Sequence, residues 1–129
     1  MPNSESNTRG VRIEVESEYI PEQSDPQTQF YFFTYHITIS NEGNLPVQLL
    51  NRHWIITDGN GKVEEVKGPG VIGEQPTLEP GDSFNYSSFC PLPTPMGTMR
   101  GYYDMILPDG QHFNAEIAEF RLVTVDTLH

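Results

Sequence analysis

Residues 11–19 read VRIEVESEY, and residues 30–41 read FYFFTYHITISN. In both segments apolar and polar side chains alternate with a period of two, which is typical of strands with one buried face. In the second segment the pattern puts one set on a common face, namely Tyr31, Phe33, Tyr35, Ile37 and Ile39, and turns Thr34, His36 and Thr38 the other way. These two segments predict a protein built from strands.

Further strand patterns follow, with turn signals about every ten residues. We expect strands at residues 47–58, 62–67, 82–90, 99–107, 111–117 and 120–125, and an irregular loop at 68–80. Asn60-Gly61 is a strong hairpin signal, and Pro108-Asp109-Gly110 is a second turn. Residues 47–58 have apolar side chains at both odd and even positions, so the pattern does not define one buried face. We expect Leu50, Trp54 and Ile56 in the core. Pro91, Pro93 and Pro95 are expected to interrupt regular structure.

Seven or eight short strands without a helical pattern indicate an all-β fold. The arrangement favours an antiparallel β-sandwich of the immunoglobulin or fibronectin type III kind, and a closed barrel is the structural alternative. The length of 129 residues fits one domain. We expect that domain to cover residues 10–129, after a flexible polar tail at residues 1–9.

The chain is acidic, with a formal net charge of -11. Binding to nucleic acid or to an anionic membrane surface requires clustered Lys and Arg, so neither is expected. No apolar run is long enough for membrane insertion, and the first residues do not resemble a signal peptide, so we expect a cytoplasmic protein. Cys90 is the one cysteine, which excludes an internal disulfide, and we expect it to be a small buried side chain.

Residues 68–73 (GPGVIG) match the G-x-G-x-x-G pattern of dinucleotide-binding loops through Gly68, Gly70 and Gly73. That function requires a following helix, whose N-terminus holds the phosphates. Pro76 and Pro80 follow here instead, and they exclude such a helix. The interpretation that we favour is a tightly turned loop between sheets, and a backbone phosphate site without a helix is the alternative.

No catalytic or metal-binding pattern is evident in the sequence. Residues 58–62 (DGNGK) begin like a calcium loop, but Lys62 and Val63 stand where a ligand and a glycine are needed. The four histidines lack metal-ligand spacing, and no serine lies in a nucleophile elbow. We therefore expect no metal, no cofactor and no enzymatic activity.

The few cations provide the candidate functional residues. Arg52 and His53 precede the single Trp54, and Arg100 lies between Gly97 and Gly101. Each arginine either pairs with local carboxylates or faces a partner, since arginine and aromatic residues favour interfaces.

Six blocks of the sequence form a recognisable set, namely residues 52–59 (RHWIITDG), 68–76 (GPGVIGEQP), 80–81 (PG), 90–95 (CPLPTP), 97–101 (GTMRG) and 120–122 (FRL). Together these blocks resemble the ApaG family of small bacterial proteins. The resemblance covers about residues 10–125 and implies a fibronectin-type sandwich. It also implies a link to cobalt and magnesium efflux, while the related domains of larger eukaryotic proteins suggest an interaction module. Because no membrane span is evident, transport by the chain itself is not expected.

Two functions are therefore expected. The first is a non-enzymatic binding module that acts through an unidentified protein partner, with Arg52, His53 and Arg100 at the contact. In that case Arg52→Ala or Arg100→Ala weakens partner capture while the fold survives. The alternative is a sensor that binds a polyphosphate or dinucleotide polyphosphate, with or without a divalent metal, at Gly68–Gly73. The oligomeric state stays open, and a homodimer is compatible with the sequence.

Overall fold

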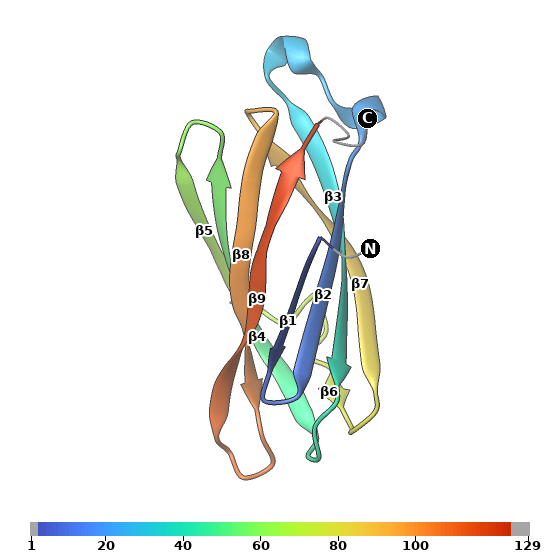
Figure 1. Cartoon of the computed structure of the whole chain (residues 1–129). Coiled ribbons are helices and arrows are strands. Elements are labelled where there is room, and N and C mark those ends of the chain that lie inside the picture. The colour runs from blue at the N-terminus through green and yellow to red at the C-terminus, as the bar shows by residue number, and fades with distance from the viewer. Residues whose placement is uncertain (1–2, 125–129) are drawn as a thin grey trace.

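The computed structural model describes residues 3–124, which form nine strands in two antiparallel sheets (Figure 1). The first sheet has the spatial order β1 (Ser4–Thr8), β2 (Val11–Tyr19), β3 (Tyr31–Asn41), β7 (Ser83–Leu92). The second has the order β5 (Val63–Pro69), β4 (Val47–Asp58), β8 (Met96–Ile106), β9 (His112–Val123), and β6 (Thr77–Leu78) also pairs with β4. Two 3-10 helices, η1 (Pro21–Gln23) and η2 (Pro26–Thr28), connect β2 to β3. The predicted β-sandwich is confirmed.

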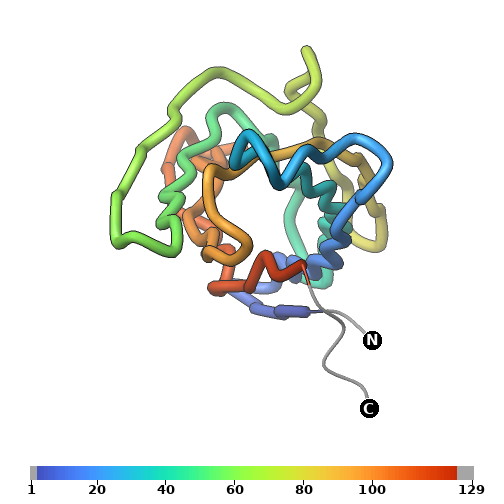
Figure 2. Tube along the Cα trace, turned by 90° about the horizontal axis from the view of Figure 1, so that it is seen from above, coloured from blue at the N-terminus to red at the C-terminus, as the bar shows by residue number. Residues whose placement is uncertain are grey.

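One side of the sandwich is closed by contacts between the two sheets, because β1 and β2 pack against β9. The Ser17 hydroxyl donates to the carbonyl of Arg121 at 3.0 Å, and the amide of Glu116 donates to the Thr8 hydroxyl at 3.1 Å. On the opposite side β5 and β7 are the outermost strands of their sheets. The connection between β5 and β7 runs along that side, away from the termini (Figure 2).

The N-terminal segment differs from the prediction. Ser4–Thr8 forms β1, in register with β2 from Ser4 opposite Val15 to Thr8 opposite Val11. The polar composition of this segment indicated a tail, but two of its half-buried side chains hydrogen-bond to the backbone of Glu116 on β9: the Ser6 hydroxyl donates to the Glu116 carbonyl, and the Thr8 hydroxyl accepts from the Glu116 amide. With β1 and β6 included, the count exceeds the seven or eight strands expected.

Strand β4 contains an irregularity that explains its double-sided apolar pattern. The register with β8 shifts between Leu49 and Asn51, so Leu50 lies in a β-bulge. As a result Leu49 is fully buried, while Leu50 is only half-buried. The expectation of Leu50 in the core was wrong; Trp54 is confirmed there, and Ile56 is half-buried and packs against the core.

Two boundaries near the C-terminal half also differ. Strand β7 continues through Pro91 to Leu92. The backbone groups of even-numbered residues in and next to β3 point toward β2: the amide of Ile20 donates to the carbonyl of Phe32, and the amide of Glu42 donates to the carbonyl of Gly10. The backbone groups of odd-numbered residues of β3 therefore point toward β7. The backbone of Pro91, opposite Phe32, thus points to the outer edge, where the missing N–H removes no hydrogen bond between strands.

The expected strands at 111–117 and 120–125 merge into β9, and Val125 lies outside the described residues.

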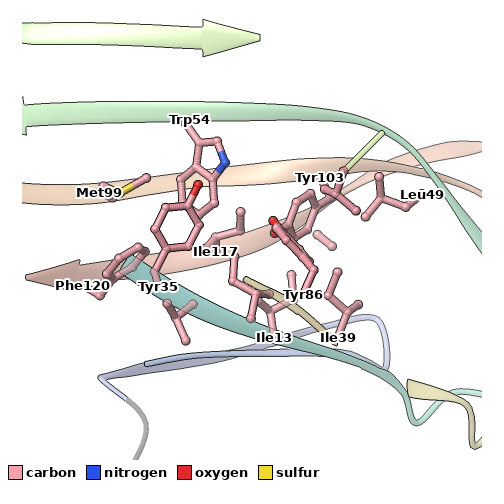
Figure 3. Close-up of a cluster of buried hydrophobic side chains, with 14 of the residues drawn as sticks. Ile13, Tyr35, Ile39, Leu49, Trp54, Tyr86, Met99, Tyr103, Ile117 and Phe120 are labelled. Atoms are coloured by element: carbon pink, nitrogen blue, oxygen red, sulfur yellow. The ribbon is translucent and has the colours of Figure 1, made fainter. Parts of the chain in front are cut away.

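The core lies between the sheets and is rich in aromatic rings (Figure 3). Trp54 is 3% exposed and packs edge-on against Tyr35 and Phe120, with ring centroids 5.4 and 5.9 Å away. The hydroxyls of Tyr86 and Tyr103 hydrogen-bond to each other inside the core, which satisfies two polar groups that burial would otherwise penalise. Cys90 is buried and free, as predicted.

The buried tyrosines and Cys90 predict a loss of stability at alkaline pH. Burial raises the pKa of Tyr35, Tyr86 and Tyr103 above 10, and burial with the nearby charge of Glu64 raises the pKa of Cys90 to about 11. The unfolded chain loses these protons at lower pH than the folded chain, so their stabilising contribution is complete below about pH 9 and declines as the pH rises further.

Urea unfolding between about pH 7 and about pH 11, followed by circular dichroism, measures this decline, and absorbance of tyrosinate follows the ionisation. Cys90→Ala should reduce the part of the decline that begins near pH 9, because the titrating thiol is removed. Full ionisation of all six tyrosines with unchanged secondary structure would contradict the prediction.

Candidate functional site

The predicted residues Arg52 and His53 lie next to each other on β4 but point in opposite directions. Side chains alternate along a strand, so His53 projects from the outer face of the five-stranded sheet, while Arg52 and Trp54 turn toward the space between the sheets. His53 lies opposite Tyr102 of β8 and Lys67 of β5. The register thus gathers side chains from three strands around His53.

His53 is held by hydrogen bonds at both ring nitrogens. Its Nδ1 lies 2.8 Å from the Tyr102 hydroxyl, and its Nε2 lies 2.7 Å from Oε1 of Glu65. The rings of His53 and Tyr102 also pack together, with centroids 4.8 Å apart. The orientation of the imidazole is therefore fixed before any ligand arrives.

A second polar group centres on Asp104, two residues after Tyr102 on β8. The Asn51 amide donates to Oδ2 of Asp104 at 2.8 Å, and Nδ1 of His112 lies 2.9 Å from Oδ1. Partial burial alone would raise the pKa of Asp104, but the hydrogen bonds from His112 and Asn51 outweigh it and lower that pKa below its ordinary value. Asp104 is therefore a stable carboxylate at neutral pH.

These two groups border a groove of about 490 Å³ that is open to solvent. It is lined by Asn51, Arg52, His53, Lys67, Gly68, Pro69, Tyr102, Asp104 and Asn114. Charges of both signs and neutral hydrogen-bonding groups line it. Among residues 3–124 no group of three or more His, Cys, Asp or Glu side chains is arranged to hold a metal ion.

Arg52 anchors the glycine-rich loop. Its Nη1 donates to the carbonyls of Pro69 and Gly70, both at 2.9 Å. No carboxylate lies within ion-pairing distance of it in the described part of the chain. The guanidinium occupies the space where a Cβ of Gly68 would lie, with Nη2 2.9 Å from that position. Gly68 therefore makes room for Arg52.

The remaining glycines of the loop have steric roles of their own. At Gly70 φ is +62°, and a Cβ there would lie 2.3 Å from the carbonyl oxygen of Glu74. Val71 and Glu74 exchange two backbone hydrogen bonds of 2.9 Å, which close a turn through Ile72 and Gly73 at positive φ. The amides of Gly70, Val71 and Glu74 are thus already bonded within the protein.

Arg100 is exposed on β8, where it lies opposite Ile55 of β4. It projects from the same face as Tyr102, two positions away, but it does not line the groove. The structure thus brings His53 and Arg100 to one face and turns the Arg52 side chain away from it.

Sequence reasoning missed four partners of this face, namely Asn51, Glu65, Tyr102 and Asp104. Each is an outward-facing polar side chain in a strand, a pattern shared with many solvated positions. The cross-strand register distinguishes three of them, because it places Asn51 opposite Asp104 and His53 opposite Tyr102, and a hydrogen bond to His53 distinguishes Glu65.

Arg52→Ala is expected to destabilise the protein, in contrast to the prediction from the sequence alone. Loss of two charge-assisted hydrogen bonds, to the carbonyls of exposed Pro69 and buried Gly70, costs roughly 1.5–3 kcal/mol. Urea unfolding followed by circular dichroism measures this, with Arg100→Ala as the matched control, which should change stability by less than about 0.5 kcal/mol because that side chain is exposed. Equal stability of both variants would show that Arg52 does not hold the loop.

Comparison with known proteins agrees with the fold. The family described as "ApaG domain" matches residues 21–107. Protein ApaG of Dechloromonas aromatica is 55% identical over 126 residues, covering 96% of this chain and 99% of that protein, and Protein ApaG of Azotobacter vinelandii is 54% identical over 119 residues, covering 92% and 94%. The crystal structure of an ApaA protein from Bordetella pertussis superposes with a TM-score of 0.88 at 51% identity, covering 91% and 95%. The chain therefore belongs to the ApaG family.

Proposed function

We propose that this chain is a non-enzymatic binding module that acts through a protein partner docking on the outer face of β4, β5, β8 and β9. The observation that carries the proposal is the fixed cluster of His53, Tyr102 and Glu65 in an open groove. A preorganised cluster loses little conformational entropy on binding, and this lowers the cost of association.

The shape and composition of the groove favour a protein surface over a small molecule. Small-molecule pockets enclose most of their ligand, whereas this groove is open. Tyrosine and arginine are enriched at the centres of protein interfaces, and Tyr102 and Arg100 both project from this face.

The chemistry of the cluster also supports binding rather than catalysis. Both ring nitrogens of His53 are already hydrogen-bonded, to Tyr102 and to Glu65. A histidine that acts directly on a substrate as a general base directs one ring nitrogen at the substrate proton, whereas both nitrogens of His53 face side chains of the protein. We therefore propose positioning and recognition as the role of His53.

Partner capture with matched variants tests this proposal. Tyr102→Ala and Arg100→Ala should each reduce the amount of a specific protein captured from cell lysate by roughly tenfold, as expected for interface residues of this type. His36→Ala, on the outer face of the other sheet, should capture as much as the wild type. Equal capture by all variants would remove this face from the proposal.

The efflux link implied by the family resemblance fits the same proposal. A cytoplasmic binding module would influence cobalt and magnesium export through its partner. Within residues 3–124 no helix is long and apolar enough to cross a membrane. Cells lacking the chain should regain cobalt tolerance with the wild type and not with Tyr102→Ala.

The polyphosphate alternative at Gly68–Gly73 stays a prediction. The backbone amides of Gly70, Val71 and Glu74 already donate hydrogen bonds within the protein. This does not favour a phosphate site, since such a site needs free N–H groups. A backbone NMR titration with diadenosine tetraphosphate, then Mg²⁺, then both, tests it. Saturable shifts confined to this loop and Arg52 would support a ligand sensor.

A further inference from the structure

Strand β7 is an edge strand with unused backbone groups. Its register to β3 places Phe84, Tyr86, Ser88 and Cys90 in the hydrogen-bonded pairs, so the backbone of Asn85, Ser87 and Phe89 faces the free edge. Within residues 3–124 the backbone N–H groups of these three residues make no hydrogen bond outside the strand ladder, and Asn85 accepts one from Thr38 through its side-chain oxygen alone. Pro91, with no N–H, ends this set of donors.

Between Ser83 and Cys90 this edge lacks the features that usually prevent strand pairing, and Pro91 lies beyond that stretch. Residues 83–92 contain no charged side chain, and the ladder to β3 has no register shift. The other outer strand of this side, β5, carries Glu64, Glu65 and Lys67. Phe89 is 61% exposed beside the free backbone. A long, regular, uncharged edge is suited to accept an additional strand.

A cleft of about 460 Å³ lies under this edge, between β7 and β5. Aromatic and aliphatic side chains from both sheets line it, including Tyr35, Trp54, Ile56, Val66, Tyr86 and Met99, and Val71 and Ile72 of the β5–β7 connection border it. Side chains of an added strand would alternate between the outer surface and this cleft. The cleft can therefore select alternate residues of the added strand.

The two ends of the cleft have opposite charge. Arg52 lines it opposite Gly68 of β5, and Glu64 lines it opposite Ile56 of β4, so the two charges are four strand positions apart, roughly 13 Å. Arg52 has no carboxylate partner in the described chain. The charge of Arg52 acts to lower the pKa of Tyr86, and the charge of Glu64 acts to raise the pKa of Cys90. Along β7, the positive charge therefore lies nearer Tyr86 and the negative charge nearer Cys90.

We infer that the β7 edge binds an extended segment of a partner protein, antiparallel to β7, with the pattern basic–x–apolar–x–acidic. The basic residue meets Glu64, the apolar residue enters the cleft opposite Ser88, and the acidic residue meets Arg52. This goes beyond the proposed function, because it concerns a different surface and a linear ligand.

Two peptides of equal composition and charge test the inference by NMR titration of the ¹⁵N-labelled protein. The first is acetyl-Thr-Lys-Thr-Leu-Thr-Glu-Thr-amide, and the second has Lys and Glu exchanged. The first should give saturable downfield shifts of the Asn85, Ser87 and Phe89 amides, and the second should bind at least about fivefold more weakly, since two ion pairs are lost. Glu64→Lys should abolish this preference, while Glu16→Lys, a matched charge change on β2, should preserve it.

The inference is overturned by absence of saturable shifts, by equal binding of the two peptides, or by shifts confined to the groove around His53. It is also overturned if sedimentation shows a dimer of the free chain whose β7 amides are already protected, because a second copy then occupies the edge. None of these outcomes depends on partner capture at the His53 face, so failure of one proposal leaves the other standing.

Discussion

Gly101→Ala is expected to leave little folded protein. A Cβ at Gly101 would lie 1.9 Å from the carbonyl oxygen of His53 and 3.0 Å from its carbonyl carbon. Both atoms are backbone in the paired strand β4, so no side-chain rotation relieves the overlap. The β4–β8 pair must separate at its centre, between Trp54 and Tyr102, at a cost of about 3 kcal/mol or more.

Urea unfolding and the yield of soluble protein measure this loss. Gly43→Ala is the matched control, because a Cβ there meets its nearest atom, Oδ1 of Asn41, at an ordinary 3.4 Å. That control should change stability by less than about 1 kcal/mol. A Gly101→Ala protein as stable as the control would show that the strands tolerate an added methyl group at this point.

Trp54→Ala is expected to produce the second large loss, about 3–5 kcal/mol. The indole is almost fully buried and contacts the rings of Tyr35, Tyr103 and Phe120, with centroids between 5.4 and 6.4 Å away. Figure 3 shows the indole among these buried rings. Removing it leaves a cavity that the surrounding structure closes only in part.

Circular dichroism during urea unfolding is the appropriate measurement, because Trp54 is the single tryptophan and its fluorescence is lost with it. Trp54→Phe keeps an aromatic ring against Tyr35 and should lose only about 1–2 kcal/mol. Ile55→Ala, on the outward face of the same strand, should lose about 1 kcal/mol. Equal losses at positions 54 and 55 would contradict the central role of the indole.

Local sequence patterns predicted those elements that depend on local physics. The period of two in residues 11–19 and 31–39 located β2 and β3 and the buried face of each. The Asn60-Gly61 turn located the β4–β5 hairpin, in which Gly61 has a φ of +84°. These predictions succeeded because the alternation and the turn residues respond to their immediate neighbours in the chain.

The predictions that failed involve long-range pairing. Ser4–Thr8 has no apolar pattern, and its strand exists because β2 and β9 supply its partners. Leu50 lies outside the core because a bulge, which the sequence does not signal, reverses the faces of β4 at that point. Pro91 fits within β7 because that position is on an outer edge.

The same division applies to the candidate site. The sequence by itself determined the β-sandwich class, because the alternation of apolar and polar side chains is a local property, and residue type suggested the Arg52–His53–Trp54 block as a candidate site. The tertiary structure alone determined that Arg52 turns inward to hold the Pro69 and Gly70 carbonyls, and that Tyr102 and Glu65 orient His53 outward. It also determined that β7 is left as an open edge above a cleft. These features depend on which strands become neighbours, and strand order follows from burial of the whole apolar surface rather than from any one segment.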